Sequence, residues 1–173
     1  RFKNLFLSPA PDVEILYAID SEREKIIRRV NSRLESVSGS YPELWPVFTE
    51  LFDFCSNYLL LTEQIVRYRT RDFKHIIKIF EPLSRTATDA GFGKAGVRQY
   101  LCFCLMEIIG AIIIEHGKFA LLAELLRVRR LNFTRDGLES IMEWELQPEF
   151  IHSRPGRSPD EAKPITVMFQ YLL

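Results

Sequence analysis

Residues 101–114 read LCFCLMEIIGAIII and carry a single charged side chain, Glu107, which makes them the most apolar stretch of the chain. A helix that is apolar on every side is buried, either in a protein interior or in a membrane. A helix of this length extends about 21 Å, short of the roughly 30 Å hydrocarbon core of a bilayer. A carboxylate near its middle would also be costly in lipid. We therefore predict a central core helix over residues 97–114 and no membrane span.

Amphipathic segments with helix start and stop signals surround this central helix. Two Ser-x-x-Glu capping boxes, at Ser21 and Ser40, are typical helix starts. Residues 12–20 fit a strand or a helix, and we favour a helix. Pro46 is expected to kink or restart the helix after Ser40. The expected helices cover residues 12–20, 21–37, 40–66, 72–81, 97–114, 119–126 and 134–146, with Asp72 and Thr134 as caps and a loop over 86–96.

The pattern predicts an all-α fold. Six or seven helices with short connections would pack as an antiparallel bundle without a sheet. An offset of 46 residues pairs apolar positions, for example Cys55 with Leu101 and Phe73 with Phe119. This leaves helix-pair repeats of the HEAT or armadillo type open as an alternative. The predicted core consists of Phe48, Phe52, Leu105, Ile108, Ile112, Leu122 and Leu126.

The domain organisation follows from a change in composition near residue 150. Residues 1–150 are predicted to form a single helical domain, residues 151–164 a linker rich in Pro and Ser, and residues 165–173 an apolar tail that could start a further element. We expect the chain to be a domain of a larger protein. If the tail docks on a partner, deleting residues 153–173 should abolish association and leave the melting temperature unchanged. A lower melting temperature would instead indicate a tail that folds back.

Composition narrows the function classes. The chain has 173 residues, 47% of them hydrophobic, and 23 basic residues balance 23 acidic ones, so a general affinity for nucleic acid or anionic membranes is not expected. The three cysteines, Cys55, Cys102 and Cys104, indicate reduced, buried thiols and a cytoplasmic location. None of the three histidines has a second His, Cys or carboxylate at metal-ligand spacing except Glu115, which faces a different direction from His116. Cys102 and Cys104 point away from each other, so we predict no metal.

Residues 91–96, GFGKAG, match the Gly-x-Gly-x-x-Gly pattern that cradles phosphates. A dinucleotide fold requires a strand directly before the glycines, and here a helix is expected in that place. We therefore interpret the glycines as a loop between helices and predict no cofactor.

Arg69 and His75 have a spacing that resembles the active-site signature of the HEPN ribonucleases, which are small helical domains that pair as dimers. The resemblance implies that His75 moves a proton of the ribose 2′-hydroxyl and that Arg69 holds the scissile phosphate. A helical ribonuclease is therefore an alternative function, and a homodimer would accompany it. The other interpretation is that Arg69 ends one helix and His75 lies in the first turn of the next.

Four basic residues, Arg67, Arg71, Lys74 and Lys78, fall at helical spacing beside Tyr68. Such a stripe can follow a phosphate backbone, which makes nucleic-acid binding a further alternative, although a solvated helix face is the simpler interpretation. Because no chemical site is assembled, the main prediction is a non-enzymatic interaction or scaffold domain. Its expected partner is another protein or another domain of the same chain.

Overall fold

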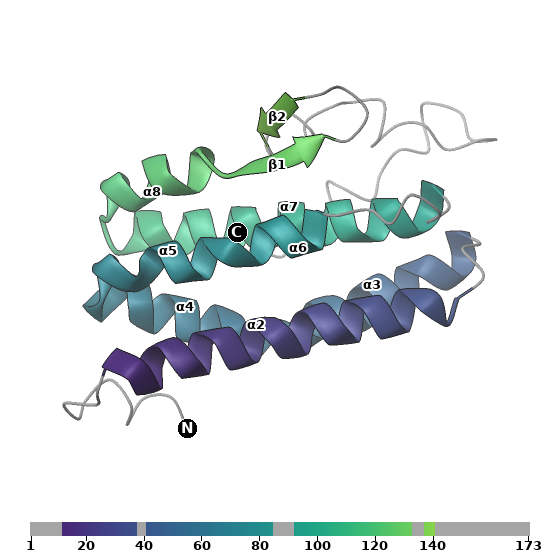
Figure 1. Cartoon of the computed structure of the whole chain (residues 1–173), viewed down its shortest axis with the longest axis horizontal. Helices are drawn as coiled ribbons and strands as arrows, with labels where there is room; N and C mark the ends of the chain where they lie inside the picture. Colours follow the sequence, from purple (N-terminus) through teal and green to yellow (C-terminus); the bar gives the residue numbers. More distant parts are fainter. Residues whose placement is uncertain (1–11, 38–40, 85–91, 133–136, 141–173) are drawn as a thin grey trace.

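The computed structural model describes residues 12–37, 41–84, 92–132 and 137–140, and these are nearly all helical (Figure 1). Short 3₁₀ turns, η1 (Thr70–Asp72) and η2 (Ile77–Ile79), separate some of the α-helices. The predicted all-α class is confirmed. The helices are α2 (Asp12–Glu35), α3 (Tyr41–Phe54), α4 (Ser56–Tyr68), α5 (Phe73–Ile76), α6 (Phe80–Ser84), α7 (Phe92–Glu115) and α8 (Phe119–Leu126).

Helix α7 lies at the centre and contacts α3, α4, α6 and α8. Its inner positions, including Leu101, Leu105 and Ile109, are completely buried. The helix begins at Phe92, so at 24 residues it is about 36 Å long, and the expected loop over 86–96 is wrong from residue 92 onward. By length and composition Val97–Glu115 could cross a membrane, so the length argument against a span was wrong. Packing against four helices is what makes α7 a core helix here.

Helix α2 is continuous where two helices were expected. Its buried residues Ile15, Ile19, Ile26 and Val30 form one stripe at helical spacing that passes through Ser21 without a break. The strand alternative for residues 12–20 is thereby excluded. Ser21 is not a helix start, because the packing of this stripe against α3 and α4 outweighs the local capping pattern.

The long helix expected after Ser40 is broken at a different residue from the one expected. Pro46 lies inside α3, five positions after the first residue, Tyr41, where the missing N–H removes a single hydrogen bond. The break occurs at Cys55, whose N–H bonds to the Phe52 carbonyl at 2.9 Å, three residues back instead of four. The Cys55 thiol also donates to the Leu51 carbonyl at 3.3 Å, which holds this turn in the core.

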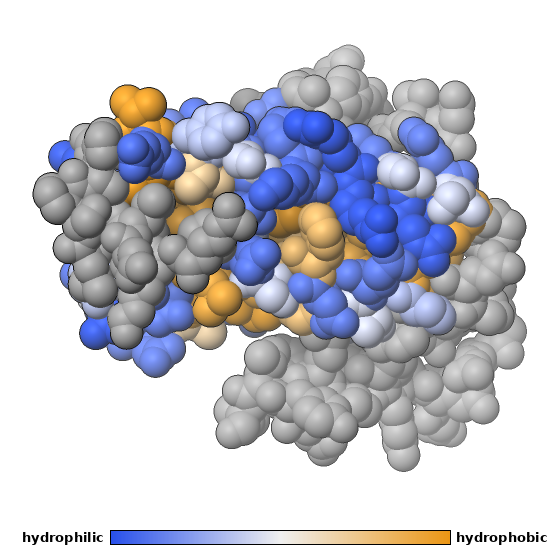
Figure 2. Space-filling model, turned by 90° about the horizontal axis from the view of Figure 1, so that it is seen from below, coloured by the Kyte–Doolittle hydropathy of each residue, from blue (hydrophilic) through white to orange (hydrophobic). Residues whose placement is uncertain are grey.

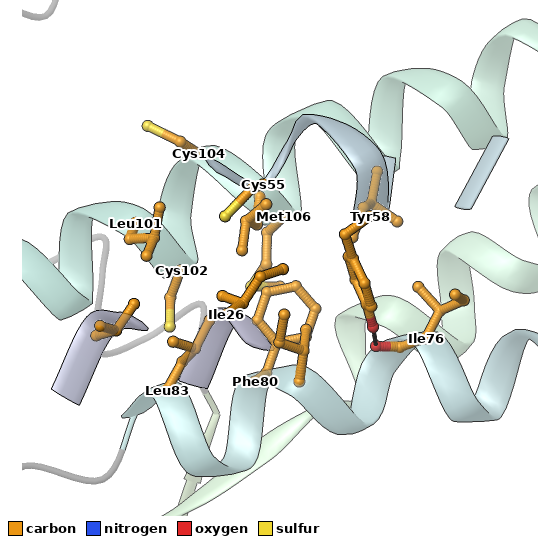
Figure 3. Packing of buried hydrophobic residues seen from close by; sticks show 14 of the residues in the cluster. Ile26, Cys55, Tyr58, Ile76, Phe80, Leu83, Leu101, Cys102, Cys104 and Met106 are labelled. Atoms are coloured by element: carbon orange, nitrogen blue, oxygen red, sulfur yellow. Dashed lines mark hydrogen bonds between the residues drawn. The ribbon is translucent and has the colours of Figure 1, made fainter. Parts of the chain in front are cut away.

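Tyr58 of α4 connects the core to the segment that follows. Its fully buried hydroxyl donates to the Ile76 carbonyl at 2.5 Å (Figure 3). In an α-helix that carbonyl would accept the N–H of Phe80, but the Phe80 N–H bonds to Ile77 instead. The 3₁₀ turn η2 therefore lies where the side chain of Tyr58 replaces a backbone donor.

Two short strands follow α8, although no sheet was expected. β1 (Arg129–Asn132) pairs antiparallel with β2 (Gly137–Ser140), with Asn132 opposite Gly137. The helix expected from Thr134 is therefore wrong over residues 137–140, and its remaining positions lie outside the described residues. Gly137, which pairs with Asn132 in the ladder, is a poor helix former and interrupts the weak helical pattern of this stretch.

Most of the predicted core residues are buried or partly buried. Phe48 and Leu105 are buried in the core, whereas Phe52, Ile112 and Leu122 are partly buried and pack against the core. The prediction that Leu126 belongs to the core was wrong, because 48% of its surface is exposed. The core also contains large residues that were not expected there: Tyr58, Phe73, Phe80, Ile15 and Ile19.

Candidate functional site

Residues 67–78 contain five basic residues and one acidic residue, and they form the corner between α4 and α5. We call this segment the basic corner. The chain turns because Arg69 leaves helical geometry, with φ −143° and ψ 52°, while its N–H still bonds to the Ile65 carbonyl at 2.8 Å. The Arg69 carbonyl then accepts the N–H of Asp72 at 2.8 Å, which starts the next helical turn.

The single carboxylate of the basic corner, Asp72, contacts two of its arginines: Arg69 closely, and Arg71 through its Nε at 4.0 Å from Asp72 Oδ1. Arg69 Nε lies 2.8 Å from Asp72 Oδ2, and both side chains are largely buried. Asp72 precedes α5 as expected, but its side chain makes no capping hydrogen bond, because Arg69 engages it. The charge of Asp72 is thus balanced inside the corner, and the other basic groups of the segment remain on the surface.

Arg67, Arg71, Lys74 and Lys78 are all exposed. The break at Arg69 leaves Arg67 on α4, whereas the other three follow the nearly continuous helical run from η1 to η2. Their spacings of three and four residues place these three near one face of that run.

Tyr68 gives the basic corner an aromatic surface. Its side chain is about half exposed, and the guanidinium carbon of Arg67 lies 5.0 Å from the centre of its ring. A shallow, open hollow is lined by Tyr68, Arg69, Thr70 and Arg71. The basic corner therefore combines the ring of Tyr68, the hydroxyl of Thr70 and several basic side chains within a few residues.

His75 and Arg69, the ribonuclease pair of the sequence prediction, both lie close to Asp72. Burial lowers the pKa of His75, and the charges of Lys78 and Lys74 lower it further, while Asp20 and Asp72 partly oppose them. A neutral imidazole can accept a proton near pH 7. Arg69 would have to hold a phosphate while its Nε remains on Asp72. The ribonuclease remains a prediction.

A second surface lies on α8, which the turn at Gly117 (φ 65°) directs back along α7. Leu121 and Leu125 of α8 are buried against this helix. The side of α8 that faces away from α7 is also apolar. Its exposed residues recur at helical spacing, and Glu124 is the only charged residue among them. We call these exposed apolar residues the outer face of α8: Phe119, Ala120, Ala123 and Leu126.

The outer face of α8 was not recognised in the sequence, where Leu126 was assigned to the core. The available signal was composition: the eight residues FALLAELL contain a single polar side chain. The face that contains α2 has hydrophilic residues interspersed with hydrophobic ones (Figure 2), and Val13 and Tyr17 of α2 are exposed as well. An amphipathic surface helix normally has one polar side, so apolar residues on both sides indicate that both are to be covered.

The other candidate groups do not assemble into a site within the described part of the chain. No cluster of three or more His, Cys, Asp or Glu is found there. The three thiols are buried among the core side chains (Figure 3). Burial raises the pKa of Cys55 to about 12. Gly93 and Gly96 of the glycine pattern lie in the first turns of α7, and Glu107 is half-buried on the same helix.

No known protein family, curated protein or solved structure matches this chain. Its function is therefore inferred from the side chains and the geometry of these two surfaces.

Proposed function

We propose that the chain is a non-enzymatic interaction or scaffold domain of a larger protein, and that it makes protein–protein or interdomain contacts. The outer face of α8 is the proposed contact surface. The observation that carries the proposal is the exposure of Phe119, at 63%, and of Leu126, at 48%, on a helix whose inner side is already buried. Contiguous exposed apolar side chains mark sites of protein association.

The helix arrangement supports this proposal. Successive long segments lie side by side in alternating directions (Figure 1), as in the antiparallel bundle that we propose. In the alternative, a helix-pair repeat, the 46-residue offset matches α5–α6 with α8. Phe73 and Phe80 are fully buried, whereas their counterparts Phe119 and Leu126 are exposed. The last pair of a repeat array exposes the face that the next pair would cover.

Light scattering as a function of protein concentration tests the contact surface. Without its natural partner, an apolar face tends to pair with the same face of a second copy, so we expect the purified chain to associate as its concentration rises. The double variant Phe119→Ser/Leu126→Ser should stay monomeric with unchanged helicity. The matched control, Val13→Ser/Tyr17→Ser, removes two exposed apolar side chains from α2 and should associate like the wild type. A wild type that is monomeric throughout, or a control that behaves like the α8 variant, would contradict the proposal.

The chain without residues 153–173 separates the two apolar segments of the protein. If the outer face of α8 drives association, the shortened chain should associate as the full chain does. If association disappears with the tail while the melting temperature is unchanged, the tail and not α8 is the contact segment.

A further inference from the structure

We propose that the basic corner binds single-stranded nucleic acid, with Tyr68 stacking on a base and Arg71, Lys74 and Lys78 contacting phosphates. This ligand site goes beyond the proposed protein contact and uses a different surface of the molecule. Its parts are the hollow beside Tyr68 and the exposed cations that continue from it along η1, α5 and η2.

The charge of the basic corner supports a polyanionic ligand. The whole chain is neutral, yet five of its 23 basic residues lie within twelve positions that contain one carboxylate. That carboxylate, Asp72, is largely buried on Arg69, and Arg71 Nε also lies 4.0 Å from it, so it offers little repulsion to a ligand outside. Lys74 of α5 and Lys78 of η2 lie about one helical turn apart, so their charges reach the same region. Several cations along one run can follow successive phosphates.

The exposed ring distinguishes a nucleic acid from other polyanions. Tyr68 is about half exposed beside the hollow, and the guanidinium of Arg67 lies against it. A phosphate needs no aromatic surface, whereas an unpaired base stacks on one, and an arginine beside the ring adds a cation–π contribution. Bases are available for stacking in single strands but not inside a duplex. The combination therefore favours a single strand over a duplex or an acidic peptide.

Fluorescence anisotropy with a labelled oligouridine of about twelve nucleotides tests the proposal on the full chain. Three phosphate contacts predict that log K falls with log salt with a slope of about −2. Arg71→Glu/Lys74→Glu removes two of the three contacts and should reduce the slope to about −0.7. Tyr68→Ala should weaken binding about five-fold or more, whereas Tyr68→Phe, which keeps the ring, should bind within about two-fold of the wild type.

The control variant Arg28→Glu/Arg127→Glu changes the net charge by the same amount at exposed sites on α2 and after α8, and it should bind like the wild type. The α8 variant Phe119→Ser/Leu126→Ser should also bind normally, so the two proposals can fail separately. The proposal is overturned if oligouridine does not bind at low salt, or if Tyr68→Ala binds as tightly as the wild type. It is also overturned if inorganic polyphosphate competes as strongly as unlabelled oligouridine, because the corner would then be a general anion surface.

Discussion

The hydroxyl of Tyr58 should contribute measurably to stability, because it satisfies a backbone carbonyl inside the core. Tyr58→Phe keeps the ring and removes the donor that lies 2.5 Å from the Ile76 carbonyl. A buried acceptor left without its donor costs about 1–3 kcal/mol. In a chain of this size, 1 kcal/mol lowers the melting temperature by about 2–4 °C. We therefore expect a decrease of roughly 2–12 °C.

Urea titration and thermal melts followed by circular dichroism measure this effect. Tyr17→Phe is the matched control, because the side chain of Tyr17 is 75% exposed and its hydroxyl should change the free energy of unfolding by less than about 0.5 kcal/mol. If Tyr58→Phe is as stable as Tyr17→Phe, the hydroxyl does not satisfy the carbonyl, and the account of η2 given above is incorrect.

Three further predictions follow from buried or paired titratable groups. Because burial raises the pKa of Cys55 to about 12 and the other two cysteines are also buried, a thiol reagent should label none of the three in the native chain and all of them in urea. The hydrogen bond from Arg33 is the largest cause that lowers the pKa of Glu50 below 4.5, so the stability it contributes is present above that pH and lost as the pH falls through the folded-state pKa. Glu50→Gln should remove this acid dependence and change stability at neutral pH by less than about 1 kcal/mol, because the pair is partly exposed. Burial lowers the pKa of His75 below 6.5, so the unfolded chain binds the proton first and stability falls as the pH drops below 6.5; urea titrations of His75→Gln should show a flatter profile there.

The sequence predicted those features of the fold that depend on strong local patterns. The apolar run around Leu105 was correctly placed at the centre, because a helix without a polar side has to be buried. The end of that helix was correctly expected before residue 119, and Gly117, which has a positive φ, lies in the turn that follows it. The all-α class follows from the same kind of periodicity.

The errors fall where distant parts of the chain decide the local structure. The bond between Tyr58 and Ile76 joins residues 18 positions apart, and no local pattern indicates it. One error is local: Asp72 resembled a helix cap, but Arg69, only three residues earlier, engages its carboxylate. Leu126 has the periodicity of a core residue, yet the inner side of α8 is filled by other leucines, so it is exposed. The spacing of apolar residues identifies which side chains favour burial, but it does not identify the part of the protein, or the partner, that buries them.

The outer face of α8 as a contact surface is the central claim, and thiol labelling at that face tests it most directly. The native cysteines are buried, so a maleimide should report on the single new thiol of Leu126→Cys. We predict rapid labelling in dilute protein and protection that increases with protein concentration as the outer face becomes covered. Tyr17→Cys on α2 should be labelled at the same rate at every concentration. A Leu126→Cys rate that does not depend on concentration, or equal protection at both positions, would contradict the account.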